Sequence, residues 1–224
     1  MIERHFDEEL QKLNSKLLKM ASLSEESIYL AIEALKNRNK ELAQNVIDND
    51  IKIDEFELEI EDYSIELLAK RQPLASDLRF IATGMRINSE LERIADLSVN
   101  IAHRARDLSK EPALKVLVHI PMLSDLAIKM VKGSIDSFVN RDLDAAKNVI
   151  KLDSEANNLR TEIHKKLVEE YMTKDVTTIP RSLSLFLVAQ HLERMCDHAK
   201  YIAEDVIYLV SAKNVKHKHE EILK

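Results

Sequence analysis

Carboxylates four residues apart recur in two places along the chain, and their type and spacing could hold a metal ion. Glu92 and Asp96 form the first pair, and Glu193 and Asp197 form the second. Residues four apart lie on one face of an α-helix. Each pair also lies beside an apolar stripe, where half-buried like charges are costly unless they are paired, protonated or metal-bound. The spacing therefore predicts two oxygen-rich cation sites.

Acids on a preceding helical segment extend both candidate sites. Asp50 and Asp54 share a helical face with apolar neighbours, so we expect them to point towards the same core as Glu92. In the second half, Asp153 repeats Asp50, whereas Asn157 stands in the place of Asp54. Oxygen ligands of this kind suit magnesium, calcium, manganese or iron better than they suit soft metals.

Two other interpretations of the acidic pairs stay open. In the first, Arg93, Arg194 or lysines of neighbouring helices neutralise the carboxylates in a salt-bridge network without metal. In the second, a metal-bound water would make the chain a metal-dependent hydrolase. No His, Lys or Ser base recurs beside the pair in both halves, and zinc-binding, Glu-x-x-His and Gly-rich phosphate motifs are absent from the sequence. The hydrolase is therefore the weaker alternative, and a non-enzymatic protein is expected.

The acidic pairs belong to an internal duplication. Residues 37–47 recur as residues 140–150, an offset of 140 − 37 = 103, with the Asn-Arg pair and the Asn-Val-Ile triplet retained. Residues 91–96 recur as residues 192–197, an offset of 192 − 91 = 101. Because two separate blocks repeat in the same order, we infer that the chain consists of two related halves.

Each half is predicted to form three amphipathic helices. Apolar residues recur at steps of three and four, as in the stripe along residues 87–108. Pro73 and Pro180 lie where a first-turn proline would begin the third helix of each half. The pattern predicts an all-α protein made of two tandem three-helix bundles, with domains at 1–110 and 111–224.

The composition disfavours several classes of protein. A formal net charge of −6 at pH 7 argues against nucleic acid as a partner, because phosphate backbones require a basic surface. Cys196 is the only cysteine, so no intramolecular disulfide can form, which fits a reducing compartment. The N-terminus lacks the basic-then-apolar order of a signal peptide. We therefore expect a soluble, cytoplasmic protein.

Two Leu-Glu-Arg-x-x-Asp segments and the stretch Gln-Pro-Leu-Ala-Ser-Asp-Leu-Arg at 72–79 resemble the PhoU family. Members of that family carry a Glu/Asp-x-x-x-Asp signature in the third helix of each of two bundles, and the resemblance covers essentially the whole chain in register. It implies a cytoplasmic accessory protein that restrains phosphate uptake. Its implied partners are the ATPase subunit of the phosphate transporter and the sensor histidine kinase of the phosphate regulon, through which it would be peripheral to the membrane. A homodimer is a further expectation.

The resemblance also assigns site residues and a cofactor. Both acidic pairs match the family motif, and Asn100, one turn beyond Asp96, matches an asparagine common there. Tyr201 stands in that place in the second half, and Asn157 replaces an acid, so the second site is expected to be the poorer one. Some members hold multinuclear metal clusters on these motifs and others are seen without them. Iron, manganese, magnesium or zinc is the expected metal.

Overall fold

A computed structural model describes residues 2–114 and 119–216 of the chain, and the helices account for most of them. The elements are α1 (Ile2–Asn37), α2 (Lys40–Arg71), α3 (Ala75–Leu108), α4 (His119–Asn140), α5 (Leu143–Lys166), the π-helical turn η1 (Leu167–Met172), the 3-10 turn η2 (Val176–Thr178) and α6 (Ile179–Ser211). These ranges contain no strand. The predicted all-α class is confirmed.

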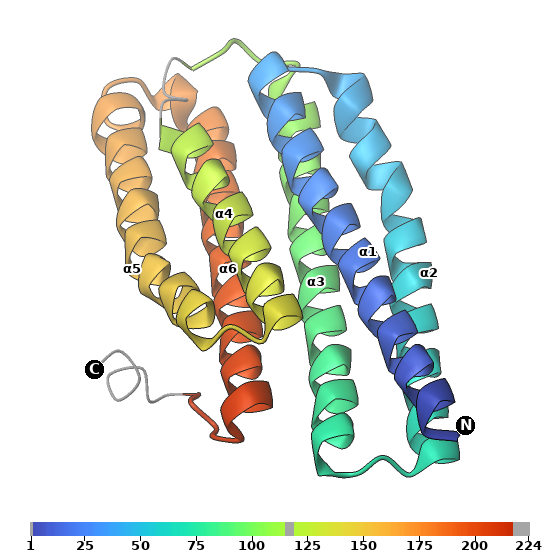
Figure 1. The fold of residues 1–224 in the computed structure, drawn as a ribbon. Helices are drawn as coiled ribbons and strands as arrows, with labels where there is room; N and C mark the ends of the chain where they lie inside the picture. The colour runs from blue at the N-terminus through green and yellow to red at the C-terminus, as the bar shows by residue number, and fades with distance from the viewer. Residues whose placement is uncertain (1, 115–118, 217–224) are drawn as a thin grey trace.

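The helices form two three-helix bundles side by side (Figure 1). Helices α1, α2 and α3 pack on one another, as do α4, α5 and α6, and the bundles meet through α3 with α6 and α1 with α4. The prediction of two tandem bundles is therefore confirmed. The domain boundary after residue 110 stays a prediction, and residues 115–118 and 217–224 of the second predicted domain lie outside the described residues.

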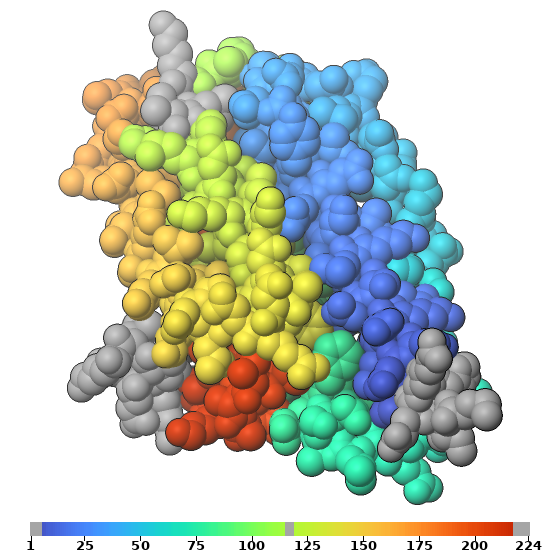
Figure 2. Space-filling view, viewed as in Figure 1, coloured from blue at the N-terminus to red at the C-terminus, as the bar shows by residue number. Residues whose placement is uncertain are grey.

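The two motif helices, α3 and α6, are central because each carries apolar side chains on more than one face. Leu91 and Ile94 on α3, and Leu192 and Met195 on α6, are completely buried. Buried residues from both bundles join in one continuous core. Figure 2 shows α1 and α4 lying side by side over one face of this pair, with the ends of α3 and α6 below them. The acidic motifs are consequently carried by the two helices that pack against both bundles.

The two predicted proline positions behave differently. Pro180 lies in the first turn of α6, as predicted. Pro73 instead precedes α3, which begins at Ala75. The reason is that Gln72 ends α2 in the left-handed region, and the chain needs the extended residue Leu74 to reverse direction before the next helix. No helix in the part of the chain that the structure describes has the length and apolar character needed to cross a membrane.

The α1–α2 and α4–α5 connections are two copies of one tight turn. Arg38 and Arg141 adopt left-handed backbone with φ of 53° and 51°. The following residues, Asn39 and Asp142, cap α2 and α5 with side-chain oxygens that accept backbone N–H groups of the first turn. Left-handed backbone costs a residue other than glycine about 1–2 kcal/mol. The left-handed backbone at each arginine therefore lowers the stability of the folded protein.

The two turns differ in what the arginine side chain contacts, and this difference predicts opposite mutant effects. Arg38 donates from Nη2 to the carbonyl oxygens of Leu108 at 2.9 Å and Ser109 at 3.1 Å, at the end of α3. Arg141 is exposed and makes no such contact with the described residues. We expect Arg141→Gly to raise the free energy of unfolding by up to about 1 kcal/mol, because it removes strain alone. Arg38→Gly should lower it by about 1 kcal/mol, because it also removes charged hydrogen bonds.

Urea denaturation of the two variants tests this pair of expectations. The two positions share sequence context and backbone conformation, so each variant is the control for the other. Changes of the same sign and size would show that the Arg38 contacts do not stabilise the end of α3.

Candidate functional site

The predicted acids of the first half come together where α2 packs on α3. Asp50 and Asp54 lie one turn apart on α2, and Glu57 follows on the next turn. Glu92 and Asp96 face them from α3, since the charge of Asp96 acts on both aspartates of α2 and the charge of Glu57 acts on Glu92. These five carboxylates are called the first cluster below.

Burial and mutual repulsion raise the pKa values in the first cluster. Burial, then the charges of Asp54 and Asp96, raise the pKa of Asp50 to about 6. Burial, then Asp96, raise the pKa of Glu92 to about 7 against the opposing charge of Arg93. Carboxyl groups with these values are partly protonated near neutral pH. The first cluster therefore holds more negative charge than the protein neutralises.

Neutralising partners are missing from the first cluster. None of its five carboxylates forms a salt bridge with a lysine or arginine of residues 6–114 and 119–216. Arg93 was predicted from the sequence as a salt-bridge partner of these carboxylates. It is exposed and acts on Glu92 only through its charge. The five carboxylates thus lie together without a paired lysine or arginine of the described residues.

The second half contains its own cations. The Nζ atom of Lys200 donates to Asp153 Oδ1 at 3.0 Å and to Asp197 Oδ1 at 2.7 Å, so it lies between α5 and α6. The Nη1 atom of Arg160 lies 3.6 Å from Glu193 Oε1. The Lys200 side chain is 12% exposed. Burial lowers the pKa of its ammonium group, but the hydrogen bonds to the two aspartates outweigh burial, so the pKa is raised and the charge is retained.

Repeat alignment shows why the second cluster (Asp153, Asn157, Arg160, Glu193, Asp197 and Lys200) carries less negative charge than the first, a formal −3 + 2 = −1 against −5. At the offset of 103, Arg160 stands in the place of Glu57, and Asn157 in the place of Asp54. At the offset of 101, Lys200 stands in the place of Val99. All three changes make the second cluster less negative than the first.

The two clusters differ in their fit to a metal ion. The first offers hard oxygen donors and unneutralised charge, which match magnesium, manganese or iron. Across residues 6–114 and 119–216, however, no three His, Cys, Asp or Glu side chains converge closely enough in this arrangement to hold one ion. The second cluster does not fit a cation, because the ammonium group of Lys200 already lies between Asp153 and Asp197.

The residues one turn beyond each motif lie at the edge of the clusters. Asn100 is exposed, and its Nδ2 donates to the backbone oxygen of Asp96 at 3.0 Å, which leaves its Oδ1 oriented by that bond. Tyr201 packs edge-on against His198, with ring centroids 6.0 Å apart. The Nζ atom of Lys200 lies over the Tyr201 ring, 5.5 Å from its centroid. Tyr201 occupies the repeat position equivalent to Asn100, and there its ring packs against neighbouring side chains instead of offering an amide oxygen to a metal.

Sequence reasoning missed Glu57, Arg160 and Lys200. The duplication contained a signal for two of them, since alignment at the offset of 103 sets Arg160 against Glu57. Lys200 lies three residues after Asp197, a spacing typical of a helical ion pair. Its second contact, with Asp153 on α5, depends on the packing of two helices and has no sequence signal.

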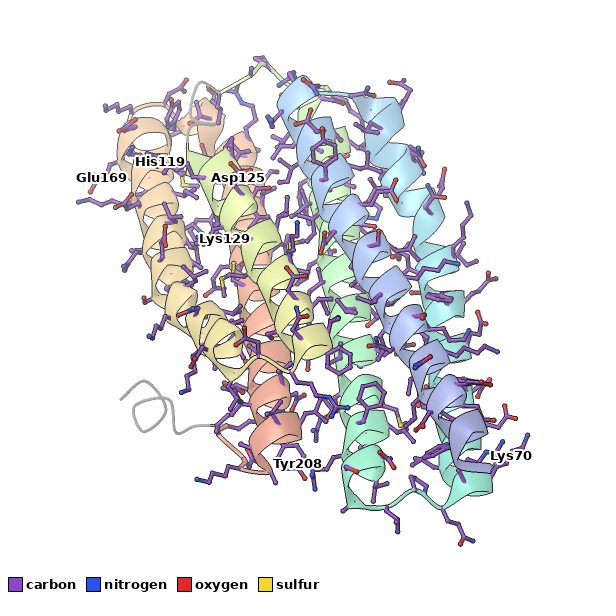
Figure 3. The ribbon with its side chains drawn as sticks, in the orientation of Figure 1. Lys70, His119, Asp125, Lys129, Glu169 and Tyr208 are labelled. Atoms are coloured by element: carbon purple, nitrogen blue, oxygen red, sulfur yellow. The ribbon has the colours of Figure 1, made fainter. Side chains whose placement is uncertain are left out.

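Polar pairs also join the two motif helices across the bundle interface. His198 Nδ1 lies 2.6 Å from Glu90 Oε2, and Arg86 Nε lies 3.2 Å from the buried carboxylate of Asp205. Arg86 also lies over the ring of Tyr208, which Figure 3 places near the end of α6. These contacts link α3 to α6.

The sequence and the fold of the chain are similar to those of known proteins. A family model described as the PhoU domain matches residues 17–105 and 120–206. The phosphate-specific transport system accessory protein PhoU homolog of Aquifex aeolicus is 41% identical over 211 residues, covering 94% of this chain and 95% of that protein. The crystal structure of PhoU from Pseudomonas aeruginosa is similar with a TM-score of 0.89 at 35% identity, covering 93% of this chain and 100% of that one.

A second solved structure agrees with the first. The phosphate transport system regulatory protein PhoU from Streptococcus pneumoniae has a TM-score of 0.86 at 26% identity, covering 94% of this chain and 99% of that one. Sequence and structure thus agree over nearly the full length of the chain and in both repeats. The chain belongs to the PhoU family.

Proposed function

We propose that this protein is a cytoplasmic, non-enzymatic regulator of phosphate uptake that acts by binding other proteins. The observation that carries the proposal is full-length similarity to proteins named phosphate-specific transport system accessory proteins. Its partners would be the ATPase subunit of the phosphate transporter and the sensor histidine kinase of the phosphate regulon. Long helices with charged outer faces are suited to this role, because they offer rigid surfaces for docking.

Deletion of the gene tests the regulatory role. Phosphate-starvation genes should stay on in phosphate-rich medium in the deletion strain, and expression of the wild-type protein should restore their repression. The strain must lack any second gene of the same family. Normal repression in such a strain would contradict the proposal, as would failure of the purified protein to bind the purified ATPase subunit and the kinase.

We further propose that the first cluster binds a divalent cation, with iron, manganese, magnesium or zinc as candidates. Asp50, Asp54, Glu57, Glu92 and Asp96 would supply the ligands, and Asn100 Oδ1 lies at the edge of this set. A bound cation would supply the positive charge that lets these carboxylates ionise together. It would also link α2 to α3. In the second cluster, Lys200 and Arg160 would serve instead of a metal.

Calorimetric titration of metal-stripped protein with Mn²⁺ tests this asymmetry. Wild type should bind the ion, and Glu92→Gln/Asp96→Asn should weaken binding by at least about tenfold, because it removes two anionic ligands. The matched control is Glu193→Gln/Asp197→Asn, the same change at the repeat positions, which should leave affinity within about twofold. Equal losses in both variants, or an equal rise in their thermal midpoints with Mn²⁺, would contradict the asymmetry.

A further inference from the structure

Helix α2 carries a stripe of exposed apolar side chains on the face turned away from the core. Ile51, Leu58 and Ile65 are 62%, 57% and 49% exposed. They are seven residues apart, so they lie on one face of the helix, as the residues of a coiled-coil seam do. At a rise of about 1.5 Å per residue the stripe is roughly 21 Å long. Figure 3 shows side chains of α2 projecting outward along the edge of the bundle, down to Lys70.

Acidic residues border this stripe. Asp48, Glu55, Glu61 and Asp62 are all exposed on α2. None of them forms a salt bridge with a lysine or arginine in the part of the chain that the structure covers. Unneutralised charge of one sign around an apolar seam favours a partner of the opposite charge.

The repeat shows that folding does not require the stripe. At the offset of 103, the first two stripe residues correspond to Ser154 and Thr161 of α5, and the third to Val168 of the π-helical turn. The first and last bordering acids correspond to Lys151 and Lys165. Helix α5 packs in its bundle as α2 does in the other, with polar residues at the first two stripe positions. The apolar stripe and its acidic border are therefore particular to α2.

We propose that this face of α2 is a docking surface for a basic amphipathic helix of a partner protein. The partner's apolar residues would pack between Ile51, Leu58 and Ile65, and its lysines or arginines would pair with the acids on either side. A second copy of this chain does not suit the face, because two acidic borders would be brought together. The surface extends beyond the proposed function, since it depends neither on the metal nor on which protein carries the basic helix.

A synthetic helix tests the docking surface. The probe is a fluorescein-labelled peptide with leucine at the a and d heptad positions and lysine at the flanking positions, titrated with the full-length protein and followed by fluorescence anisotropy. An otherwise identical peptide with glutamate in place of lysine should bind at least about tenfold more weakly. Ile51→Ser/Leu58→Thr, which introduces the residues found in α5, should weaken binding of the lysine peptide by at least about tenfold.

Two controls separate the stripe from general attraction to an acidic protein. Val176→Ser removes an apolar side chain that is 72% exposed outside the stripe, and it should leave affinity within about twofold. In wild type, amide NMR shifts on addition of the lysine peptide should concentrate on residues 48–65. Unchanged affinity in the double variant, shifts confined to other helices, or a wild-type dimer in sedimentation that the double variant abolishes would each overturn the proposal.

Discussion

Lys200→Met is expected to lower the free energy of unfolding by about 2 kcal/mol at pH 7. Lys200 is the only cation that contacts both Asp153 and Asp197 among the described residues, and the two aspartates are 24% and 31% exposed. Removing one partner of a fully buried ion pair costs about 3–5 kcal/mol, because it leaves an unpaired charge. The value expected here is smaller because solvent still reaches both carboxylates.

The loss caused by Lys200→Met should shrink as the pH falls towards 4. Without the ammonium group, the mutual repulsion of Asp153, Asp197 and Glu193 is no longer offset. Burial and the charges of the two aspartates already raise the pKa of Glu193 against the opposing charges of Arg160 and Lys200, and the loss of Lys200 should raise it further. Protonation then favours the folded variant, and its disadvantage relative to wild type decreases. The measurement is urea denaturation of both proteins at several pH values.

A matched control separates this effect from the general loss of a lysine. Lys165 is 70% exposed and lies 4.0 Å from the exposed carboxylate of Glu169, so Lys165→Met should change stability by less than about 0.5 kcal/mol. A Lys200→Met variant no less stable than this control would show that the second cluster does not depend on its internal cation. Addition of Mn²⁺ should partly restore the Lys200→Met variant, because the two freed aspartates can then take an ion.

The metal-free protein is expected to become less stable as the pH rises from about 4 to about 7. Glu92 has a pKa of about 7 in place of an ordinary value of 4.5, and Asp50 one of about 6 in place of 3.8. Between these values the folded state binds more protons than the unfolded state does, so the slope of stability against pH is negative. The contribution of the first cluster is favourable below this window and is lost through it.

Asp50→Asn/Glu92→Gln should remove most of that slope. It should also stabilise the metal-free protein at pH 7.5 by on the order of 1 kcal/mol, a figure reduced from the full linkage value because both side chains are only partly buried. Thermal unfolding in the presence of a chelator measures both effects. A slope that survives in full in the double variant would mean that groups other than Asp50 and Glu92 control the pH dependence.

The same double variant separates protonation from metal binding. In wild type, a saturating divalent cation should flatten the slope, because it favours the ionised carboxylates of the folded state. The variant should show neither the slope nor the response to the cation. If the cation stabilises wild type and the variant equally, it binds outside the first cluster.

The predictions for Lys200 and for Asp50 with Glu92 both follow from one difference between the duplicated clusters, namely whether the chain supplies a cation to the carboxylates. Both halves retain an acid on the second helix and an acidic pair on the third, at Asp50 and Asp153 and in the two motifs. The first half then adds Glu57, whereas the second adds Arg160 and Lys200. Because a cation supplied by the chain cannot dissociate, the proposed cation binding would make only the first half responsive to the concentration of an ion.

Much of the architecture follows from the sequence alone. Helical periodicity and the two repeat offsets predicted six helices in two bundles, because both are properties of neighbouring residues along the chain. The repeat also marked Asn157 and Tyr201 as departures in the second half, and so predicted its poorer fit to a metal. The predicted start of the third helix was wrong, because the turn after Gln72 has to reverse the chain and so places Pro73 before α3.

Only the tertiary structure decided whether the carboxylates of each acidic cluster are paired with a cation of the chain. Whether Lys200 reaches Asp153 depends on how α5 and α6 are rotated and packed against each other, and residue spacing along one helix contains no such information. The same holds for Arg160 against Glu193 and for Glu57 beside Glu92. The sequence therefore determined which residues form the acidic motifs, and helix packing determined which motif keeps its unneutralised charge.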